Sequence, residues 1–264
     1  MLRYALAVAL LLAAGAVRAA EDRYPQMAAA YLVKRDGQLL WAGKAQERLP
    51  PASLAKMMTA LLVLEGGKLD RVVAVGGGVA HESGTRIGLR PGEKLRVRDL
   101  LAALVIRSAN DACRALADHL GKTTARFVAM MNRRAQALDL ADTRFADPCG
   151  HDHPGQYSTA SDLARLAEAL MRNDDYLRLA RMQRGAISTI DGARTFRFET
   201  TNALIGRYPG AIGLKTGYTE RAGNCLVALA ERDGVRVLVV MLNAPNRWWN
   251  AVGLLNRAFE TPPQ

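Results

Sequence analysis

The sequence has 264 residues, half of them hydrophobic, and a formal net charge of +11. This length allows one large domain or two small ones, and the apolar fraction is sufficient for a full core without disulfide bridges. The charge alone would fit a nucleic-acid-binding protein, but no nucleic-acid-binding motif is found. We expect a basic protein of this kind to interact with an anionic partner, such as cell-wall polymer or lipid headgroups. The alternative is that the charge serves solubility alone.

The first nineteen residues have the pattern of a secretory signal peptide. Arg3 precedes an uncharged, mostly apolar run from Tyr4 to Val17, and Val17-Arg18-Ala19 places small residues where signal peptidase reads them. The run is short for a membrane span, so a retained anchor or a core helix is the less favoured alternative. Cleavage after Ala19 removes two arginines and no acids, which lowers the net charge from +11 to +9. We expect a periplasmic or otherwise extracytoplasmic protein.

Two strand pairs are predicted, one near each end of the sequence. Apolar runs in residues 27–45 flank Asp36-Gly37, and apolar runs in residues 224–243 flank Asp233-Gly234. An Asp-Gly pair between apolar runs is a strong signal for a β-hairpin. Residues 210–219 are predicted to form a further strand directly before the second hairpin.

The middle of the sequence is predicted to be helical. Apolar residues recur at helical spacing in five segments: one that begins at Ser53, and 98–106, 111–121, 124–140 and 161–173. A final helix is predicted at about 247–259, after the last strand. Strands at both ends with helices between them predict an α/β (α+β) domain. Its antiparallel sheet would join the N- and C-terminal strands, with a helical insertion. We find no repeat and no linker, and therefore expect one domain over residues 20–264.

The cysteines are Cys113, Cys149 and Cys225. An odd number leaves at least one unpaired within the chain, and the spacing is not that of a disulfide framework. We expect three buried or free thiols, with a single bridge as the alternative.

The first chemical motif is Ser53-Leu-Ala-Lys56, at the start of a predicted helix after two prolines. A lysine in the first turn is disfavoured by the helix dipole, so its presence there needs a reason. Residues three apart share a helix face, and serine becomes a nucleophile when a neighbouring base takes its proton. Burial or a second cation would lower the pKa of Lys56 enough for this role. Alone the pattern occurs by chance, and a capping serine beside a snorkelling lysine is the alternative.

Two further motifs follow in order along the sequence. Ser108-Ala-Asn110 lies between two predicted helices, where the hydroxyl could relay a proton and the amide could bind a substrate carbonyl and Lys56; plain helix capping is the alternative. Lys215-Thr216-Gly217 lies on a predicted strand, where Lys215 and Thr216 could bind a carboxylate and Gly217 allows another backbone to approach. Lys215 is also the expected second cation that lowers the pKa of Lys56. An edge lysine beside a hairpin is the structural alternative.

With these three motifs in order, the sequence resembles the low-molecular-mass D-alanyl-D-alanine carboxypeptidases, which are serine-type penicillin-binding proteins. The resemblance extends over roughly residues 24–260 and implies a β-lactamase/DD-peptidase-like fold, with a five-stranded antiparallel sheet flanked by helices and a helical subdomain. It implies that Ser53 is the acylated nucleophile, Lys56 the general base and Ser108 a proton relay. The implied substrate-binding residues are Asn110, Lys215, Thr216, Gly217, Tyr218 and Thr219, with the N–H groups of Ser53 and Tyr218 as the oxyanion hole.

The implied substrates are peptidoglycan stem peptides ending in D-Ala-D-Ala, with β-lactams as covalent inhibitors. Many relatives continue into a second β domain and a C-terminal membrane anchor. Because this sequence stops at Gln264, we expect neither feature, and expect a monomer without cofactor or nucleic-acid partner. Some shortened relatives cut peptide cross-links, so a D,D-endopeptidase is the main alternative activity.

Three other functions are less consistent with the sequence. A class A β-lactamase shares the motifs but usually has Glu-x-x-Leu-Asn between the second and third, and no such sequence lies between Asn110 and Lys215. A non-catalytic cell-wall binder is disfavoured because every motif residue is present. Metal binding by the segment from Cys149 to His153 is disfavoured because its spacing matches no standard zinc site, so we predict no metal.

Overall fold

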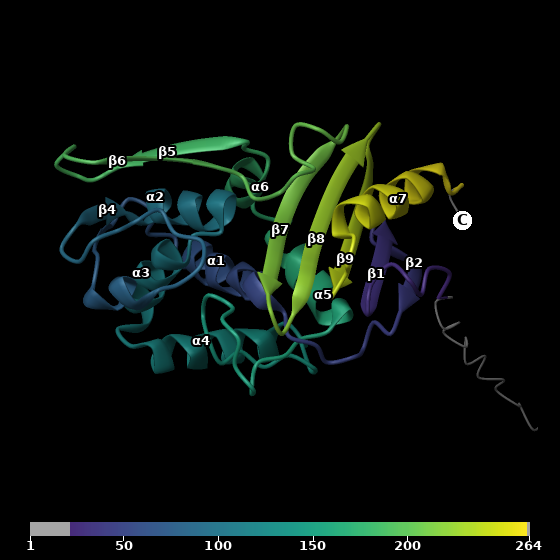
Figure 1. The fold of residues 1–264 in the computed structure, drawn as a ribbon, viewed down its shortest axis with the longest axis horizontal. Coiled ribbons are helices and arrows are strands. Elements are labelled where there is room, and N and C mark those ends of the chain that lie inside the picture. Colours follow the sequence, from purple (N-terminus) through teal and green to yellow (C-terminus); the bar gives the residue numbers. More distant parts are fainter. Residues whose placement is uncertain (1–21, 263–264) are drawn as a thin grey trace, which may run out of the picture.

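The computed structural model describes residues 22–262, so the predicted signal segment lies outside the described residues. Its centre is a five-stranded antiparallel sheet in the order β2-β1-β9-β8-β7 (Figure 1). Strand β1 pairs with β9, so the N- and C-terminal strands are neighbours as predicted. The strands of this sheet are β1 Ala30–Arg35, β2 Gln38–Gly43, β7 Ala211–Thr219, β8 Gly223–Arg232 and β9 Val235–Leu242.

Both predicted hairpins form around their Asp-Gly pairs. Asp36 and Gly37 have φ angles of 49° and 81°, and Asp233 and Gly234 have 50° and 78°. Two consecutive residues with positive φ make the two-residue turn whose twist matches that of the flanking strands. Aspartate is one of the few side chains that tolerate this conformation.

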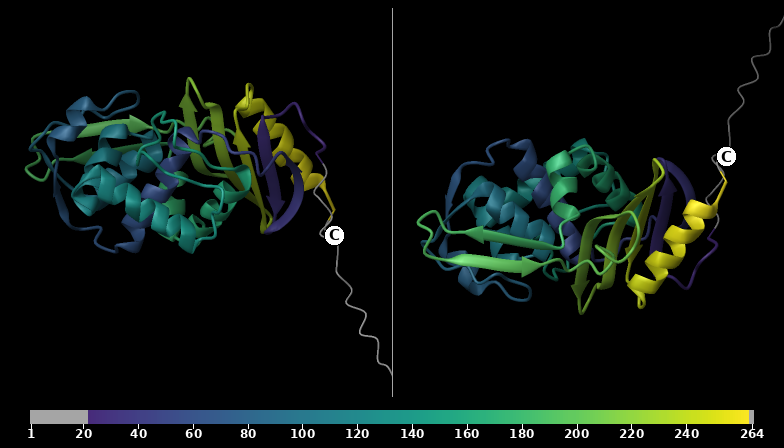
Figure 2. Two further views of the ribbon diagram at one scale, coloured as in Figure 1. Left: turned by 90° about the horizontal axis from the view of Figure 1, so that it is seen from below. Right: turned by 90° about the horizontal axis from the view of Figure 1, so that it is seen from above.

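Helices cover both faces of the sheet, as Figure 2 shows. Helix α7 (Arg247–Glu260) packs on one face and α5 (Ala160–Leu170) on the other. Along β9, Val237 and its alternate neighbours join the core under α7, whereas Leu238 and its alternate neighbours join the core on the α5 side. Because successive side chains of a strand point to opposite faces, burial on both sides produces the nearly continuous apolar runs of the sequence.

A helical region lies beside the edge of the sheet formed by β7 (Figure 1). Helix α2 continues through a π-helical turn, η3, that ends directly before Ser108. The elements of this region are η1 Ala52–Ala55, α1 Lys56–Glu65, η2 Gly77–His81, α2 Val97–Ala102, η3 Ala103–Arg107, α3 Asn110–Gly121, α4 Thr124–Ala137 and α6 Asp174–Ala180.

Two small two-stranded sheets, neither of them predicted from the sequence, complete the fold. One joins β3 (Val72–Ala74) and β4 (Lys94–Arg96), which are too short to show a periodicity. The other joins β5 (Arg184–Ser188) and β6 (Thr195–Glu199) around Asp191-Gly192, a signal of the kind that located the other hairpins. Helix α6 was also missed.

The expectation of three thiols is wrong. Cys113 of α3 and Cys149, in the loop before α5, form a disulfide with their Cα atoms 5.8 Å apart, and Cys225 is a buried free cysteine. The two bridged residues are 36 positions apart, and only the packing of the loop against α3 brings them together.

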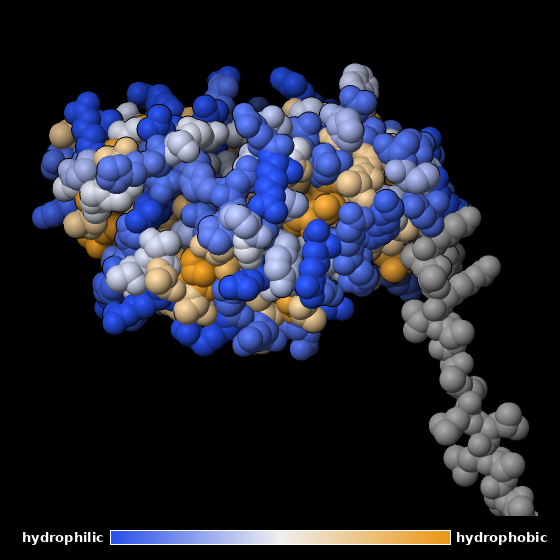
Figure 3. Space-filling model, turned by 60° about the horizontal axis from the view of Figure 1, so that its bottom comes forward, coloured by the Kyte–Doolittle hydropathy of each residue, from blue (hydrophilic) through white to orange (hydrophobic). Residues whose placement is uncertain are grey.

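The surface shown in Figure 3 carries mostly hydrophilic residues with small apolar patches between them. Within residues 22–262, no helix is both long enough and apolar enough to cross a membrane.

Candidate active site

Ser53 lies in η1, one turn before the lysine that begins α1. Neither η1 nor α1 has a side-chain hydrogen bond at its N-cap, so Ser53 does not serve as a cap. The preceding residue, Ala52, has a left-handed φ of 50°, a conformation that alanine rarely adopts. This bend carries the chain from the two prolines into α1 and leaves Ser53 lining a cleft.

Lys56 is completely buried, and its ammonium nitrogen contacts three acceptors. Nζ donates to Ser53 Oγ at 2.9 Å, to Asn110 Oδ1 at 2.6 Å and to the backbone carbonyl of Cys149. Burial lowers the pKa of Lys56 to about 7, against the opposing charges of Asp147 and Glu82. A lysine with this pKa supplies a substantial fraction of neutral amine at neutral pH, which is what a general base requires.

Of the two causes predicted for the lowered pKa of Lys56, burial is the main one, whereas the predicted contribution of Lys215 is not found. Lys215 is itself buried, and burial together with the charges of Lys56 and Arg247 holds its pKa well below the usual value. Its Nζ donates to Ser108 Oγ at 2.6 Å and to the Thr216 carbonyl at 2.9 Å. A hydroxyl from the second motif therefore contacts a lysine from the third.

Ser108 has φ and ψ angles of 61° and 31°, in the left-handed region. This conformation is unfavourable for serine. Residues held in unfavourable backbone conformations are common at functional sites, where the surrounding structure stabilises them. The bend directs the next residues into α3, where Asn110 is fixed from two sides. Asn110 N donates to the Thr85 carbonyl at 2.7 Å, and Asn110 Nδ2 donates to the Ser83 carbonyl at 2.6 Å.

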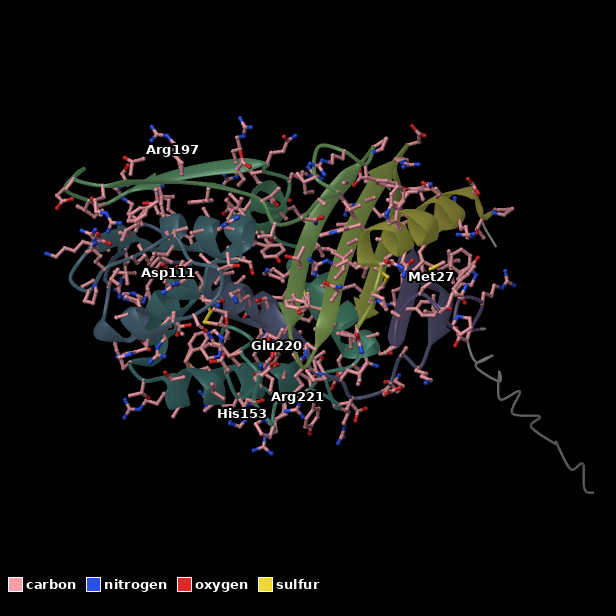
Figure 4. All side chains as sticks on the ribbon, viewed as in Figure 1. Met27, Asp111, His153, Arg197, Glu220 and Arg221 are labelled. Carbon is pink, nitrogen blue, oxygen red and sulfur yellow. A yellow bond between two sulfur atoms is a disulfide. The ribbon has the colours of Figure 1, made fainter. Side chains whose placement is uncertain are left out.

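Asp111 follows the second motif directly and is labelled in Figure 4. Its buried carboxylate accepts from the backbone N–H groups of Ile87, Gly88, Leu89 and Ala112 at 2.8–3.2 Å. These hydrogen bonds tie residues 87–89 to the start of α3. The segment that holds Asn110 is therefore itself anchored by Asp111, a role that was not predicted from the sequence.

Strand β7 forms the edge of the sheet that faces η1. A Cβ atom at Gly217 would lie 3.1 Å from Ala52 Cβ and 3.2 Å from Ser53 N, so glycine allows the close approach that the sequence predicted. Thr216 Oγ1 lies 2.8 Å from Thr201 Oγ1. At the strand end, Thr219 Oγ1 donates to Asp152 Oδ1 at 2.7 Å.

The three motifs meet at a cleft of about 360 Å³. Lys56 and Lys215 lie directly behind its wall, bonded to Ser53 and Ser108. Seven of the nine predicted site residues line the cleft, namely Ser53, Ser108, Asn110, Thr216, Gly217, Tyr218 and Thr219.

Arg247 and Thr201 also line the cleft, and the sequence analysis missed both. Arg247 Nη1 donates to the Gly217 carbonyl at 2.6 Å, and its buried Nε has no hydrogen-bond partner within residues 22–262. Arg247 is the first residue of α7, where the helix dipole disfavours a cation. The same signal drew attention to Lys56, so Arg247 could have been found from the sequence.

The residues weighed as metal ligands have other partners. Cys149 is in the disulfide, and His151 Nε2 lies 2.7 Å from Glu82 Oε2, a hydrogen bond that raises the pKa of His151. Asp152 accepts from Thr219, and His153 Nδ1 accepts from Gly155 N at 3.0 Å. Across the described part of the chain, no three His, Cys, Asp or Glu side chains are grouped to hold a metal ion.

Comparison with known proteins decides the family. The family described as D-alanyl-D-alanine carboxypeptidase matches residues 18–246, which is most of the sequence. The chain belongs to the D-alanyl-D-alanine carboxypeptidase family. This confirms the resemblance stated from the motifs.

Relatives of the carboxypeptidase family support the assignment. The chain is 35% identical over 221 residues to D-alanyl-D-alanine carboxypeptidase DacF of Bacillus subtilis, an alignment of 81% of this chain and 57% of that protein. It is 33% identical to D-alanyl-D-alanine carboxypeptidase DacB2 of Mycobacterium tuberculosis, over 86% of this chain and 80% of that protein. The chain spans a little over half the length of DacF and of the Escherichia coli relatives DacC and DacD.

The fold also matches that of a solved relative. The structure of the Streptomyces K15 DD-transpeptidase superposes with a TM-score of 0.83 at 30% identity, covering 89% of this chain and 98% of that one. The predicted DD-peptidase-like fold is therefore confirmed.

Proposed function

We propose that this protein is a serine-type D-alanyl-D-alanine carboxypeptidase that removes the terminal D-Ala of peptidoglycan stem peptides. The observation that carries the proposal is the position of Ser53 Oγ, 2.9 Å from the amine of a buried lysine with a pKa of about 7, at the wall of a cleft. Family membership and the relatives named as D-alanyl-D-alanine carboxypeptidases support it.

In this mechanism neutral Lys56 takes the proton of Ser53 while Oγ attacks the carbonyl carbon of the penultimate D-Ala. The N–H groups of Ser53 and Tyr218 stabilise the tetrahedral oxyanion. The proton then passes to the leaving nitrogen by way of Ser108, the C–N bond breaks, and D-Ala departs. Water hydrolyses the ester on Ser53 and restores the enzyme.

The remaining residues hold the substrate. Lys215 and Thr216 bind the terminal carboxylate, and Arg247 adds positive charge on that side of the cleft. Asn110 uses one N–H of its amide for Ser83 and has a second N–H for the substrate carbonyl. Gly217 and Thr219 belong to an edge strand, so the peptide backbone can pair with β7 as an added strand.

The location proposed for this reaction is outside the cytoplasm. The signal-peptide pattern supports it, and so does the Cys113–Cys149 bridge, because disulfides persist mainly in oxidising compartments. No cofactor or metal takes part in the proposed steps.

Digestion of purified muropeptides, with products identified by mass, tests the proposal. A carboxypeptidase shortens monomeric pentapeptides by one D-Ala and leaves cross-linked dimers intact. Conversion of dimers to monomers with pentapeptides untouched would instead favour the endopeptidase. Rapid turnover of penicillin in a parallel assay would favour a β-lactamase, and a protein without any adduct would be a binder.

A further inference from the structure

The Cys113–Cys149 bridge joins two segments that each supply an acceptor to Lys56. Cys113 lies in the first turn of α3, the helix that begins with Asn110. The backbone carbonyl of Cys149 accepts directly from Lys56 Nζ. Both cysteines are buried, at 0% and 1% exposure, so the bridge lies in the wall behind the cleft rather than on the surface.

The Cys149 carbonyl belongs to a loop without helix or strand structure. Within the loop, Asp147 Oδ1 accepts from Cys149 N at 2.8 Å and from His151 N at 2.9 Å. These two hydrogen bonds shape the loop but do not attach it to its surroundings. The loop is attached to other segments by hydrogen bonds from Thr59 Oγ1 to the Pro148 carbonyl, between His151 Nε2 and Glu82 Oε2, and from Thr219 Oγ1 to Asp152 Oδ1, each at 2.7 Å. The bridge is its one covalent link to α3 among the described residues.

We propose that the Cys113–Cys149 disulfide is a positioning element of the active site, which holds the Cys149 carbonyl and the Asn110 amide at a fixed separation around Lys56 Nζ. This rests on the proposed function, in which Lys56 is the base. Without the bridge the loop can move away from α3, and Lys56 loses a fixed acceptor. A misplacement of about 1 Å in a catalytic group can cost roughly a hundredfold in rate.

The oxidised and reduced forms of one polypeptide provide the test. In a Cys225→Ala background the only thiols are those released from the bridge, so alkylation and intact mass report its state. A phosphine reductant and water convert the disulfide to two thiols and the phosphine oxide. We expect the reduced, folded protein to be acylated by a fluorescent penicillin about ten- to a hundredfold more slowly. Its pH profile should shift upward, because water entering the loosened site reverses the effect of burial on Lys56.

A second variant, Cys113→Ala/Cys149→Ala in the same background, gives the comparison without reductant. The oxidised Cys225→Ala protein is the control and should keep the wild-type acylation rate. If folded bridge-free protein is acylated at the control rate with the same pH profile, the bridge is merely structural and the inference is overturned, even if the melting temperature falls. Absence of labelling in the oxidised control would overturn the proposed function itself.

Discussion

At the residue scale, Lys56 combines two features that each disfavour its ammonium form. It is buried, and it lies in the first turn of α1, where the helix dipole repels positive charge. For a lysine with only a structural role, either feature would be unfavourable. For a base that must be neutral to accept the proton of Ser53, both features favour the neutral amine that is needed.

The pH dependence of acylation follows from this lowered pKa. Because neutral Lys56 is the active form, the rate of acylation by a penicillin should rise with pH through about 7 and level off above it. Stopped-flow labelling across pH 5–9 measures this dependence. An exposed lysine, with its pKa near 10.4, would show no such step in that range. Lys56→Ala should be slower by several orders of magnitude and lose the step. A near-normal rate in Lys56→Ala would exclude Lys56 as the base.

At the scale of elements, the cleft depends on the close approach of η1 and β7 at Gly217. In Gly217→Ala the added Cβ would lie 3.1–3.2 Å from atoms of residues 51–53, so β7 must shift away from the nucleophile. We expect acylation to fall roughly a hundredfold through the widened oxyanion hole, as for loss of one donor. Gly77→Ala is the matched control because Gly77 is exposed and a Cβ there meets nothing within 4 Å. Equal rates in the two variants would contradict this account.

The attachment of residues 87–89 to α3 gives a second prediction at this scale. Asp111→Asn replaces one carboxylate oxygen by an NH₂ group that faces backbone N–H donors. We expect the free energy of unfolding to fall by about 3 kcal/mol. Acylation should also slow, since the neighbouring segment holds Asn110. Urea denaturation measures the first effect. Asp118→Asn, which alters only a partly exposed pair with Arg114, should change stability by less than about 1 kcal/mol.

At the scale of the whole molecule, the net charge of +9 expected after signal cleavage should affect encounters with polymeric substrate more than turnover of small peptides. Co-sedimentation with isolated, anionic cell-wall material should weaken between about 0.05 and 0.5 M salt, because surface charges are screened. Hydrolysis of a short stem peptide should change much less over that range. Binding to the cell wall that is insensitive to salt would show that the charge serves solubility alone.

The whole molecule also shows what the sequence could predict. Ser53 and Lys56 are three residues apart and Ser108 and Asn110 two apart, so local spacing was enough to predict that the members of each pair lie close together. The Asp-Gly turns fixed the main hairpins for the same reason. The Cys113–Cys149 bridge and the Thr201–Thr216 contact join residues far apart in the chain, and a single sequence holds no signal for them. From the sequence, burial and a second cation were both possible causes of the lowered pKa of Lys56, and only the packed structure shows that burial is the main one.

The most direct test of the central claim is to map the covalent adduct formed with a penicillin. The wild-type protein should gain the mass of one penicillin, and proteolytic fragments should place it on Ser53. Ser53→Ala, which removes only the hydroxyl oxygen, should fold normally and gain no mass. An adduct on another residue, or labelling of Ser53→Ala at the wild-type rate, would contradict the assignment of Ser53 as the nucleophile.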